Sequence, residues 1–435
     1  MQEKARLVVV LLIVSMVSGA WGRPFFYAYV GDAVSGLGAI EVDAETGKFS
    51  GHRSLAEFPV SLVPDKIRLS KGGMVVGVSL QGGKDGAYAI HNLETGENLK
   101  LLALDFEPVE HRGFGDSFLV AGSKGHLVVI DATTGRVRAS WNARESLQPS
   151  GHKVEDIQIS RDGSKAALSF QKDSSSGKHL GSRLVWIDLP KLDHWVDLEI
   201  PRSRPDLHME GTLKEVGPNP EVIRLEEESN TILMTLDLYG ALWLADLNAS
   251  LEGKWRNTTM VPTAQDRGWG NSFPDRLGRF THNGEGYYLV INAGDDTGFG
   301  IFRLRDRSFV GFQDSLVGAE EPIYFPKSER IATAVSGKVK VRGEGGLNKF
   351  YEPDYLMRIF HIDEWNGEGP LPETEVGLPG VASRIVGLFG ERSIALLAVD
   401  GEGHGGTSWA LVTVDVETGE ILDKIETLGM VTRLE

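Results

Sequence analysis

Short apolar or alternating runs, each broken by a polar turn, extend over nearly the whole chain, and few stretches show the 3.6-residue spacing of an amphipathic helix. One unit recurs: a glycine, a strand-like run, an Asp or Asn, and a turn that ends in Thr-Gly. It is clearest in Gly38-Ala-Ile-Glu-Val-Asp43-Ala-Glu-Thr-Gly47 and returns over residues 86–96, 125–135 and 410–419. The unit predicts a β-hairpin, because the Asp side chain can accept hydrogen bonds from turn amides and the glycine can take the left-handed conformation.

Weaker copies of this unit, such as Leu184–Asp188 and Leu242–Asp246, fill the interval between the clear ones. The turn positions of the whole series lie 39 to 59 residues apart, at Asp43, Asn92, Asp131, Asp188, Asp246, Arg305, Asp363 and Asp415. A blade of four short strands needs about 40–50 residues before loop insertions. The spacing therefore predicts an all-β fold, a single-ring β-propeller.

The two ends of the chain indicate how the ring closes. The first unit begins at Phe26–Val30, which leaves room for only three strands, and the chain ends with a lone strand candidate, Met430–Leu434. Placing that last strand innermost in the first blade completes eight blades and hides the sheet edges. Seven blades with one irregular unit is the alternative. No linker rich in Pro, Gly and Ser divides residues 23–435, so we expect one propeller domain.

The first 22 residues have the order of a secretory signal peptide. Lys4 and Arg6 precede an apolar run, Leu7–Val17, and small residues follow up to Gly22. The apolar run is short for a hydrocarbon core of about 30 Å. We expect cleavage and a secreted or periplasmic protein without stable membrane insertion; an uncleaved N-terminal anchor is the alternative.

Composition narrows the classes of function. Hydrophobic residues make up 41% of the chain, so a core can form, and the 53 glycines suit many tight turns. The net charge of −16 opposes binding to nucleic acid, which requires clustered Lys and Arg. The chain has no cysteine, which excludes thiolate metal sites, cysteine nucleophiles and haem attachment through Cys-x-x-Cys-His.

The opening Phe26-Tyr-Ala-Tyr-Val-Gly31, followed by Gly38–Gly47, resembles the start of the lactonase-like, YVTN-type propellers. The Asp-Ala-x-Thr-Gly turns also resemble those of quinoprotein-type repeats. These resemblances cover the four clear hairpins and imply a scaffold that hosts enzymes, binding modules and assembly platforms alike. The paired cysteines that accompany the quinone in quinoprotein dehydrogenases are absent, and no lactonase catalytic motif matches residue by residue.

The segments that enter the innermost strands are rich in groups that titrate or bind ligands, and we expect them at one mouth of the central channel. His111 and His152 stand out because they fall at equivalent points of adjacent blades, and the loop around Trp269 mixes aromatic, amide and charged groups. The candidate ligand-binding residues are Asp65, Glu110, His111, Arg112, His152, Asp156, Trp269, Asn271, Asp275, Arg276 and Arg384.

Two hypotheses about function remain open at this stage. The first is a monomeric binding scaffold for an unidentified small-molecule or protein ligand, with its site at the channel mouth. The second is a lactonase-like hydrolase of a lactone or ester, with His111 or His152 as general base and a divalent cation, held by carboxylates, that polarises the carbonyl. The sequence does not decide whether the chain is an enzyme, and it identifies no cofactor beyond that cation.

Overall fold

The computed structural model describes residues 23–31, 34–59, 61–70, 73–82, 85–93, 98–122, 125–147, 152–173, 179–201, 219–236, 239–263, 274–292, 298–314, 322–335, 338–343, 346–351, 355–390, 392–401 and 409–434. The predicted signal peptide, residues 1–22, lies outside this range. Among the described residues, no helix is long and apolar enough to cross a bilayer.

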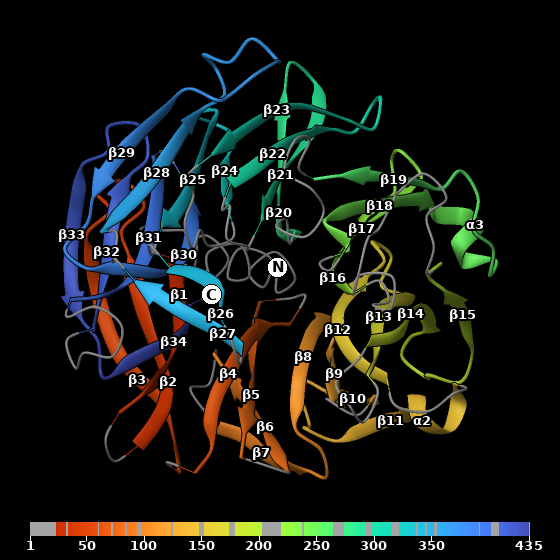
Figure 1. The fold of residues 1–435 in the computed structure, drawn as a ribbon. Coiled ribbons are helices and arrows are strands. Elements are labelled where there is room, and N and C mark those ends of the chain that lie inside the picture. The colour runs from red at the N-terminus through yellow and green to blue at the C-terminus, as the bar shows by residue number, and fades with distance from the viewer. Residues whose placement is uncertain are drawn as a thin grey trace, which may run out of the picture.

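Eight four-stranded antiparallel sheets stand around a common centre, as Figure 1 shows. The first blade is built, from the centre outward, of β34 (Met430–Leu434), β1 (Arg23–Val30), β2 (Val34–Val42) and β3 (Phe49–Pro59). Blade 2 consists of β4 (Val63–Leu69), β5 (Val75–Gln81), β6 (Gly86–Asn92) and β7 (Asn98–Leu104). Blade 3 consists of β8 (Pro108–Phe114), β9 (Ser117–Gly122), β10 (His126–Asp131) and β11 (Val137–Asn142). Blade 4 consists of β12 (His152–Ile159), β13 (Lys165–Asp173), β14 (His179–Asp188) and β15 (Trp195–Glu199).

The second half of the ring repeats the same order. Blade 5 consists of β16 (Pro220–Glu226), β17 (Thr231–Leu236), β18 (Ala241–Asp246) and β19 (Thr259–Pro262), and blade 6 of β20 (Pro274–His282), β21 (Glu285–Asn292), β22 (Gly298–Arg303) and β23 (Ser308–Asp314). Blade 7 consists of β24 (Ile323–Phe325), β25 (Arg330–Val335), β28 (Leu356–His361) and β29 (Glu373–Gly377). Blade 8 consists of β30 (Val381–Phe389), β31 (Ser393–Asp400), β32 (Trp409–Asp415) and β33 (Ile421–Glu426). The described helices are two short ones, α2 (Ala143–Ser146) and α3 (Leu247–Leu251).

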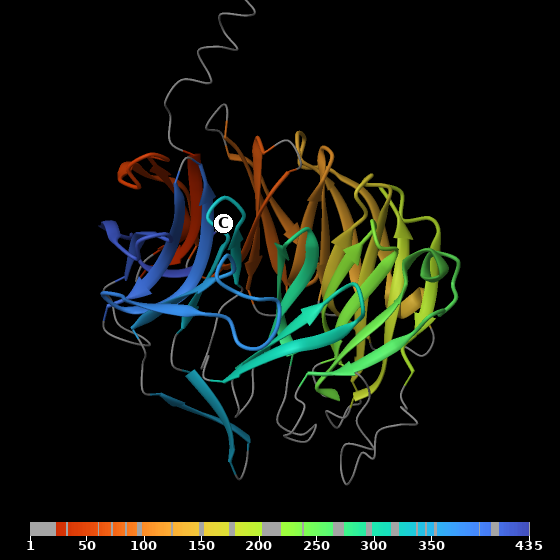
Figure 2. The same ribbon diagram turned by 90° about the horizontal axis from the view of Figure 1, so that it is seen from above.

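Blade 7 carries an insertion. Between its second and third strands, β26 (Lys338–Gly343) and β27 (Gly346–Tyr351) pair only with each other as a separate two-stranded sheet. Figure 2 shows this blue-green hairpin projecting from one face of the ring.

The ring closes as the sequence predicts, with eight blades and not seven. Each innermost strand contacts the next around the centre, from β34 through β4, β8, β12, β16, β20, β24 and β30 back to β34. Closure rests on β34, which pairs with β1 through Tyr27↔Leu434 and Val30↔Met430. This pairing joins the two ends of the chain and leaves β1 without a free edge.

The Thr-Gly turns form in the way that their residues predict. Asp131 Oδ1 accepts the backbone N–H groups of Thr133 at 2.9 Å and of Thr134 at 2.7 Å. Gly135 follows at a φ of 62°, in the left-handed region where a side chain would be strained. Asp43 and Asp415 make the same contacts in their own turns. Each of these turns connects the third strand of a blade to its outermost strand.

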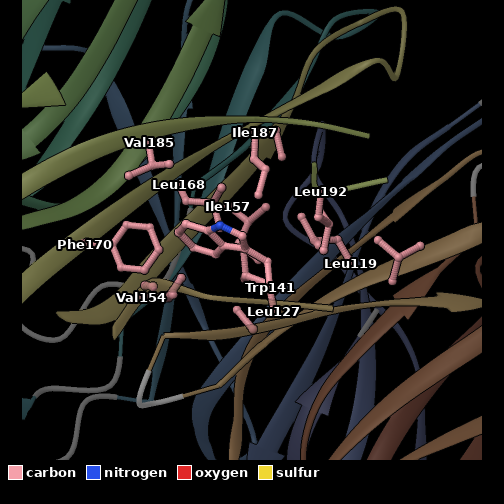
Figure 3. Packing of buried hydrophobic residues seen from close by; sticks show 14 of the residues in the cluster. Leu119, Leu127, Trp141, Val154, Ile157, Leu168, Phe170, Val185, Ile187 and Leu192 are labelled. Carbon is pink, nitrogen blue, oxygen red and sulfur yellow. The ribbon is translucent and has the colours of Figure 1, made fainter. Parts of the chain in front are cut away.

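Burial explains the apolar runs of the sequence. A strand in the middle of a blade is covered on both faces by neighbouring blades, and all eight residues of β31 are buried. The outermost strand β33 instead alternates between exposed and partly buried residues. Figure 3 shows one interface, between blades 3 and 4, where Trp141 packs against Phe170 with Val154 beside them. The centroids of the two aromatic rings lie 6.3 Å apart. Each interface of this kind is a hydrophobic core, so the core of the molecule is divided around the ring.

Candidate functional site

The candidate site is built on the innermost strands, and these share a local irregularity. A bulge inserts one extra residue into each innermost strand except β24, with register shifts at Pro64/Lys66 in β4, Pro108/Glu110 in β8 and Val154/Asp156 in β12. Comparable shifts occur in β16, β20, β30 and β34. A bulge bends its strand and re-aims the adjoining side chains. The residues that follow it therefore occupy corresponding positions around the channel.

Hydroxyl side chains support the bulges from the second strand. Ser79 Oγ accepts the N–H of Lys66 at 3.0 Å, and Ser169 Oγ accepts that of Asp156 at 3.0 Å. In blade 3 the corresponding second-strand residue is Ala121, which has no hydroxyl group. The carboxylates of Glu110 and Asp156 each accept the next backbone N–H, that of His111 at 3.0 Å and that of Ile157 at 2.8 Å.

An inner-strand ion network, consisting of Lys66, Arg68, Glu110, Arg112, Asp156 and Arg224, joins blades 2 to 5. Glu110 is its hub: its carboxylate contacts Lys66 Nζ at 2.6 Å and Arg112 at 2.7 Å. Arg112 then reaches Asp156 at 3.0 Å in the next blade. Glu110 is only 5% exposed, so these contacts are shielded from water.

The charges of the network keep Glu110 ionised. Burial by itself would raise the pKa of Glu110, but the neighbouring cations of Arg112, Lys66 and Arg68 outweigh it, and the pKa lies below its ordinary value. Asp65, at the bulge of β4, behaves in the opposite way. Burial raises its pKa, and this effect exceeds the opposing charges of Lys66, Arg433 and Arg384. Arg433 of blade 1 and Arg384 of blade 8 are therefore electrostatic neighbours of Asp65.

His111 does not face the channel. Its side chain is fully buried at 0% exposure, and its Nδ1 lies 2.6 Å from the hydroxyl of Tyr88. Burial, followed by the charge of Arg68, lowers the pKa of His111 well below 6.5. A ligand in the channel cannot reach this imidazole.

The two predicted histidines are not equivalent in the repeat, which corrects the sequence analysis. Counting from the bulge, His111 corresponds to Ile157 and not to His152, because Glu110 and Asp156 both follow the bulge directly. His152 is the first residue of β12, and its side chain lies outside the described part of the chain, as does that of Asp275 in β20. Trp269 and Asn271 also fall outside the described residues.

The remaining candidates do lie on innermost strands. Asp65, Arg276 and Arg384 belong to β4, β20 and β30, while Glu110, Arg112 and Asp156 take part in the ion network. The sequence analysis missed Lys66, Arg68, Arg224 and Arg433. A signal for them was present, because a basic residue next to a buried aliphatic one recurs in Lys66-Ile67-Arg68, Ile223-Arg224 and Arg384-Ile385.

The predicted cation site does not assemble in the channel among the residues that the structure describes. The one described group of three side chains close enough to share a metal ion is His361, Asp363 and Glu364, at the end of β28 and in the turn that follows it, away from the innermost strands. It is a mostly exposed group in which Asp363 pairs with Arg330.

The charge of the innermost strands differs in sign from that of the whole chain. By sequence, these eight strands contain nine Lys or Arg residues and seven Asp or Glu residues, whereas the chain has a net charge of −16. The cations stay partly accessible: the side chains of Lys66, Arg112 and Arg224 are each 23% exposed. The innermost strands therefore carry a small excess of basic residues inside an acidic protein.

Comparison with known proteins supports the fold. No protein-family model and no curated protein matches the sequence. Among solved structures, the dihydro-haem d1 dehydrogenase NirN in complex with DHE has a TM-score of 0.62 at 13% identity, over 94% of this chain and 74% of that one. AztD from Citrobacter koseri has a TM-score of 0.51 at 11% identity, over 95% and 97% of the two chains.

Quinohaemoprotein alcohol dehydrogenase ADHIIG from Pseudomonas putida HK5 has a TM-score of 0.55 at 10% identity, over 82% of this chain and 65% of that one. Putative 6-phosphogluconolactonases are among the similar structures as well. The likeness to NirN, AztD and ADHIIG confirms the β-propeller fold that the sequence predicts. At these identities the likeness concerns the fold alone.

Proposed function

We propose that this chain is an exported binding propeller that holds an anionic ligand in its central channel. The observation that carries the proposal is the excess of Lys and Arg over Asp and Glu in the sequences of the innermost strands. Guanidinium groups bind carboxylates and phosphates through paired, charge-assisted hydrogen bonds. Export rests on the predicted signal peptide.

The channel wall formed by blades 8 and 1 suits the ligand best. Arg384 on β30 and Arg433 on β34 lie on adjacent innermost strands, and both are electrostatic neighbours of Asp65. We therefore place the anion beside Arg384 and Arg433.

Hydrolysis of a lactone or ester is less well supported. The general base of that hypothesis was His111 or His152, and His111 is buried away from any substrate. The side chain of His152 is outside the described residues. Binding requires only the charges that the innermost strands contain, so we favour a binding protein.

Calorimetric titration of the mature protein with pyrophosphate and citrate at low salt tests this proposal. We expect at least one of the two anions to bind, and we expect Arg384→Gln and Arg433→Gln each to weaken binding about tenfold, the cost of one charge-assisted hydrogen bond. Asp65→Asn should strengthen binding, because it removes a nearby negative charge. Raising the salt concentration should weaken it.

The matched control is Arg161→Gln, which removes an arginine whose side chain is 68% exposed and which pairs with Glu228. It should leave binding unchanged. The absence of binding by both anions, or equal affinity in all four variants, would refute the channel site.

A further inference from the structure

A second hollow lies on the opposite side of the ring from the channel mouth, between blades 6 and 7. It measures about 330 Å³ and is lined by polar groups that include Asn283, Glu285, Tyr287, Arg303, Asn366 and Glu368. Blade 6 contributes the turn after β20 and the end of β22, and blade 7 contributes the loop after β28. Because β20 ends at His282, this hollow lies where innermost strands end, whereas the channel candidates lie where they begin.

The charged groups of the hollow are held in place before any ligand binds. Arg303 Nε donates to Asp306 at 3.0 Å. Glu285 pairs with Arg305 and also accepts the hydroxyl of Tyr287 at 3.2 Å. Side chains that are already oriented lose less conformational entropy on binding. The hydrogen-bond donors and acceptors of the hollow are therefore already oriented before a ligand binds.

The loop from blade 7 is also fixed. The ring centroid of Trp365 lies 5.3 Å from that of Tyr287 and 5.3 Å from that of His282. Its Nε1 donates a hydrogen bond to the backbone carbonyl of Glu368 at 3.0 Å. The N–H of Gly369 donates to Val310 of blade 6 at 2.9 Å. Gly367 has a φ of 93° and places no side chain in the space. The aromatic cluster thus forms a rigid base under a polar opening.

The balance of these groups identifies the class of ligand. The hollow is lined by one guanidinium, Arg303, and by two carboxylates, Glu285 and Glu368. Arg303 already pairs with Asp306 and Glu285 with Arg305, so neither an anion nor a simple cation is strongly preferred. A hydroxyl group can donate to a carboxylate and accept from a guanidinium or amide at the same time. The volume is near the lower end of the 300–1,000 Å³ typical of small-ligand sites. We infer that this hollow binds a neutral mono- or disaccharide.

Saturation-transfer NMR and calorimetry on the full mature chain test the inference, with glucose, galactose, mannose, N-acetylglucosamine and lactose as probes. We expect at least one sugar to bind, and Glu285→Gln and Glu368→Ala each to weaken it about tenfold, the effect of losing one hydrogen bond to a charged group. Glu368 is exposed, so its variant should fold even if the change at Glu285 disturbs the pair with Arg305.

Glu228→Gln is the matched control, because it removes a carboxylate from the corresponding hairpin of blade 5, where it pairs with Arg161 at 3.2 Å. It should not change sugar binding. Arg384→Gln should not change it either, which separates this site from the channel. If no sugar of the panel binds, or if binding is unchanged in both pocket variants, the inference is refuted.

Discussion

At the scale of single residues, His111 is the exception to the repeat. The corresponding residues of other innermost strands are Ile67, Ile157 and Ile223, all fully buried against an apolar partner on the second strand. His111 keeps this position and faces Val120. Its Nδ1 is satisfied by Tyr88, whereas Nε2 has no hydrogen-bond partner among the described residues. A buried polar pair thus replaces an aliphatic contact.

This burial predicts a pH-dependent stability. The pKa of His111 is far below 6.5 in the folded protein because of burial, so only the unfolded chain takes up a proton there near pH 6. The free energy of unfolding should therefore fall as the pH drops below 6.5, by about 1.4 kcal/mol per pH unit from this group. Urea denaturation between pH 7.5 and 5.5 measures the slope, which should be smaller in His111→Ile.

The partner of His111 provides a second test. Tyr88→Phe alone leaves Nδ1 buried without a partner and should cost about 1–3 kcal/mol in the free energy of unfolding. Tyr88→Phe combined with His111→Ile removes both polar groups and should cost less than the sum of the single changes. Strictly additive costs would show that the 2.6 Å contact contributes nothing.

At the scale of elements, the innermost strands are the polar components of an apolar fold. Their bulges place charged residues at corresponding positions, and ion pairs between strands then link neighbouring blades. Glu110 contacts cations of blade 2 and of its own blade, and Arg112 extends the contact to Asp156 in blade 4. These ion pairs connect innermost strands that belong to different sheets and so share no backbone ladder.

Glu110→Gln should destabilise the protein strongly. It leaves Lys66, Arg68 and Arg112 without their shared carboxylate, and the loss of one partner from a buried ion pair costs about 3–5 kcal/mol. Because the pKa of Glu110 is lowered by these cations, its contribution should be complete above about pH 4.5 and be lost as the pH falls further. Chemical denaturation of the variant at pH 7 measures the cost.

Glu375→Gln serves as its control. That carboxylate also contacts an arginine, Arg358, at 2.7 Å, but its side chain is 51% exposed. We expect a change below about 1 kcal/mol, as for other exposed pairs. Similar costs in the two variants would mean that burial gives the inner network no special weight.

At the scale of the whole molecule, stability depends on a closed ring. Each blade buries its apolar faces only against its neighbours, so an opening at one place exposes cores on both sides of it. The junction is β34, whose Val431 and Leu434 are buried in the core between blades 8 and 1. The last strand of the chain therefore secures the first blade.

A chain that ends after Gly429 tests this dependence. It leaves the inner edge of β1 unpaired, and an exposed strand edge promotes association with other chains. We expect a clearly lower melting temperature and aggregates in size-exclusion chromatography. Met430→Ala, at a residue 41% exposed, should change neither. A truncated chain that melts with the full-length protein would contradict closure by β34.

Much of the fold could be predicted from local pattern, whereas the site could be predicted only in part. The turns at Asp131 and Asp415 form from hydrogen bonds within four residues, so their signal is contained in the sequence. The place of Glu110 and Asp156 on innermost strands followed from a correct assignment of blades. The position of the bulge could not be predicted from the sequence. For that reason the predicted equivalence of His111 and His152 is wrong.

The repeat, the propeller fold and the closing strand could be predicted from the sequence, with eight blades favoured over seven, because hairpins and their spacing depend on neighbours along the chain. Which charged residues meet could not be predicted in this way, because Lys66, Glu110, Arg112 and Asp156 come from three blades that are brought together by ring closure. The polar hollow between blades 6 and 7 has the same origin: Glu285 and Glu368 are distant in sequence and meet because adjacent blades pack together.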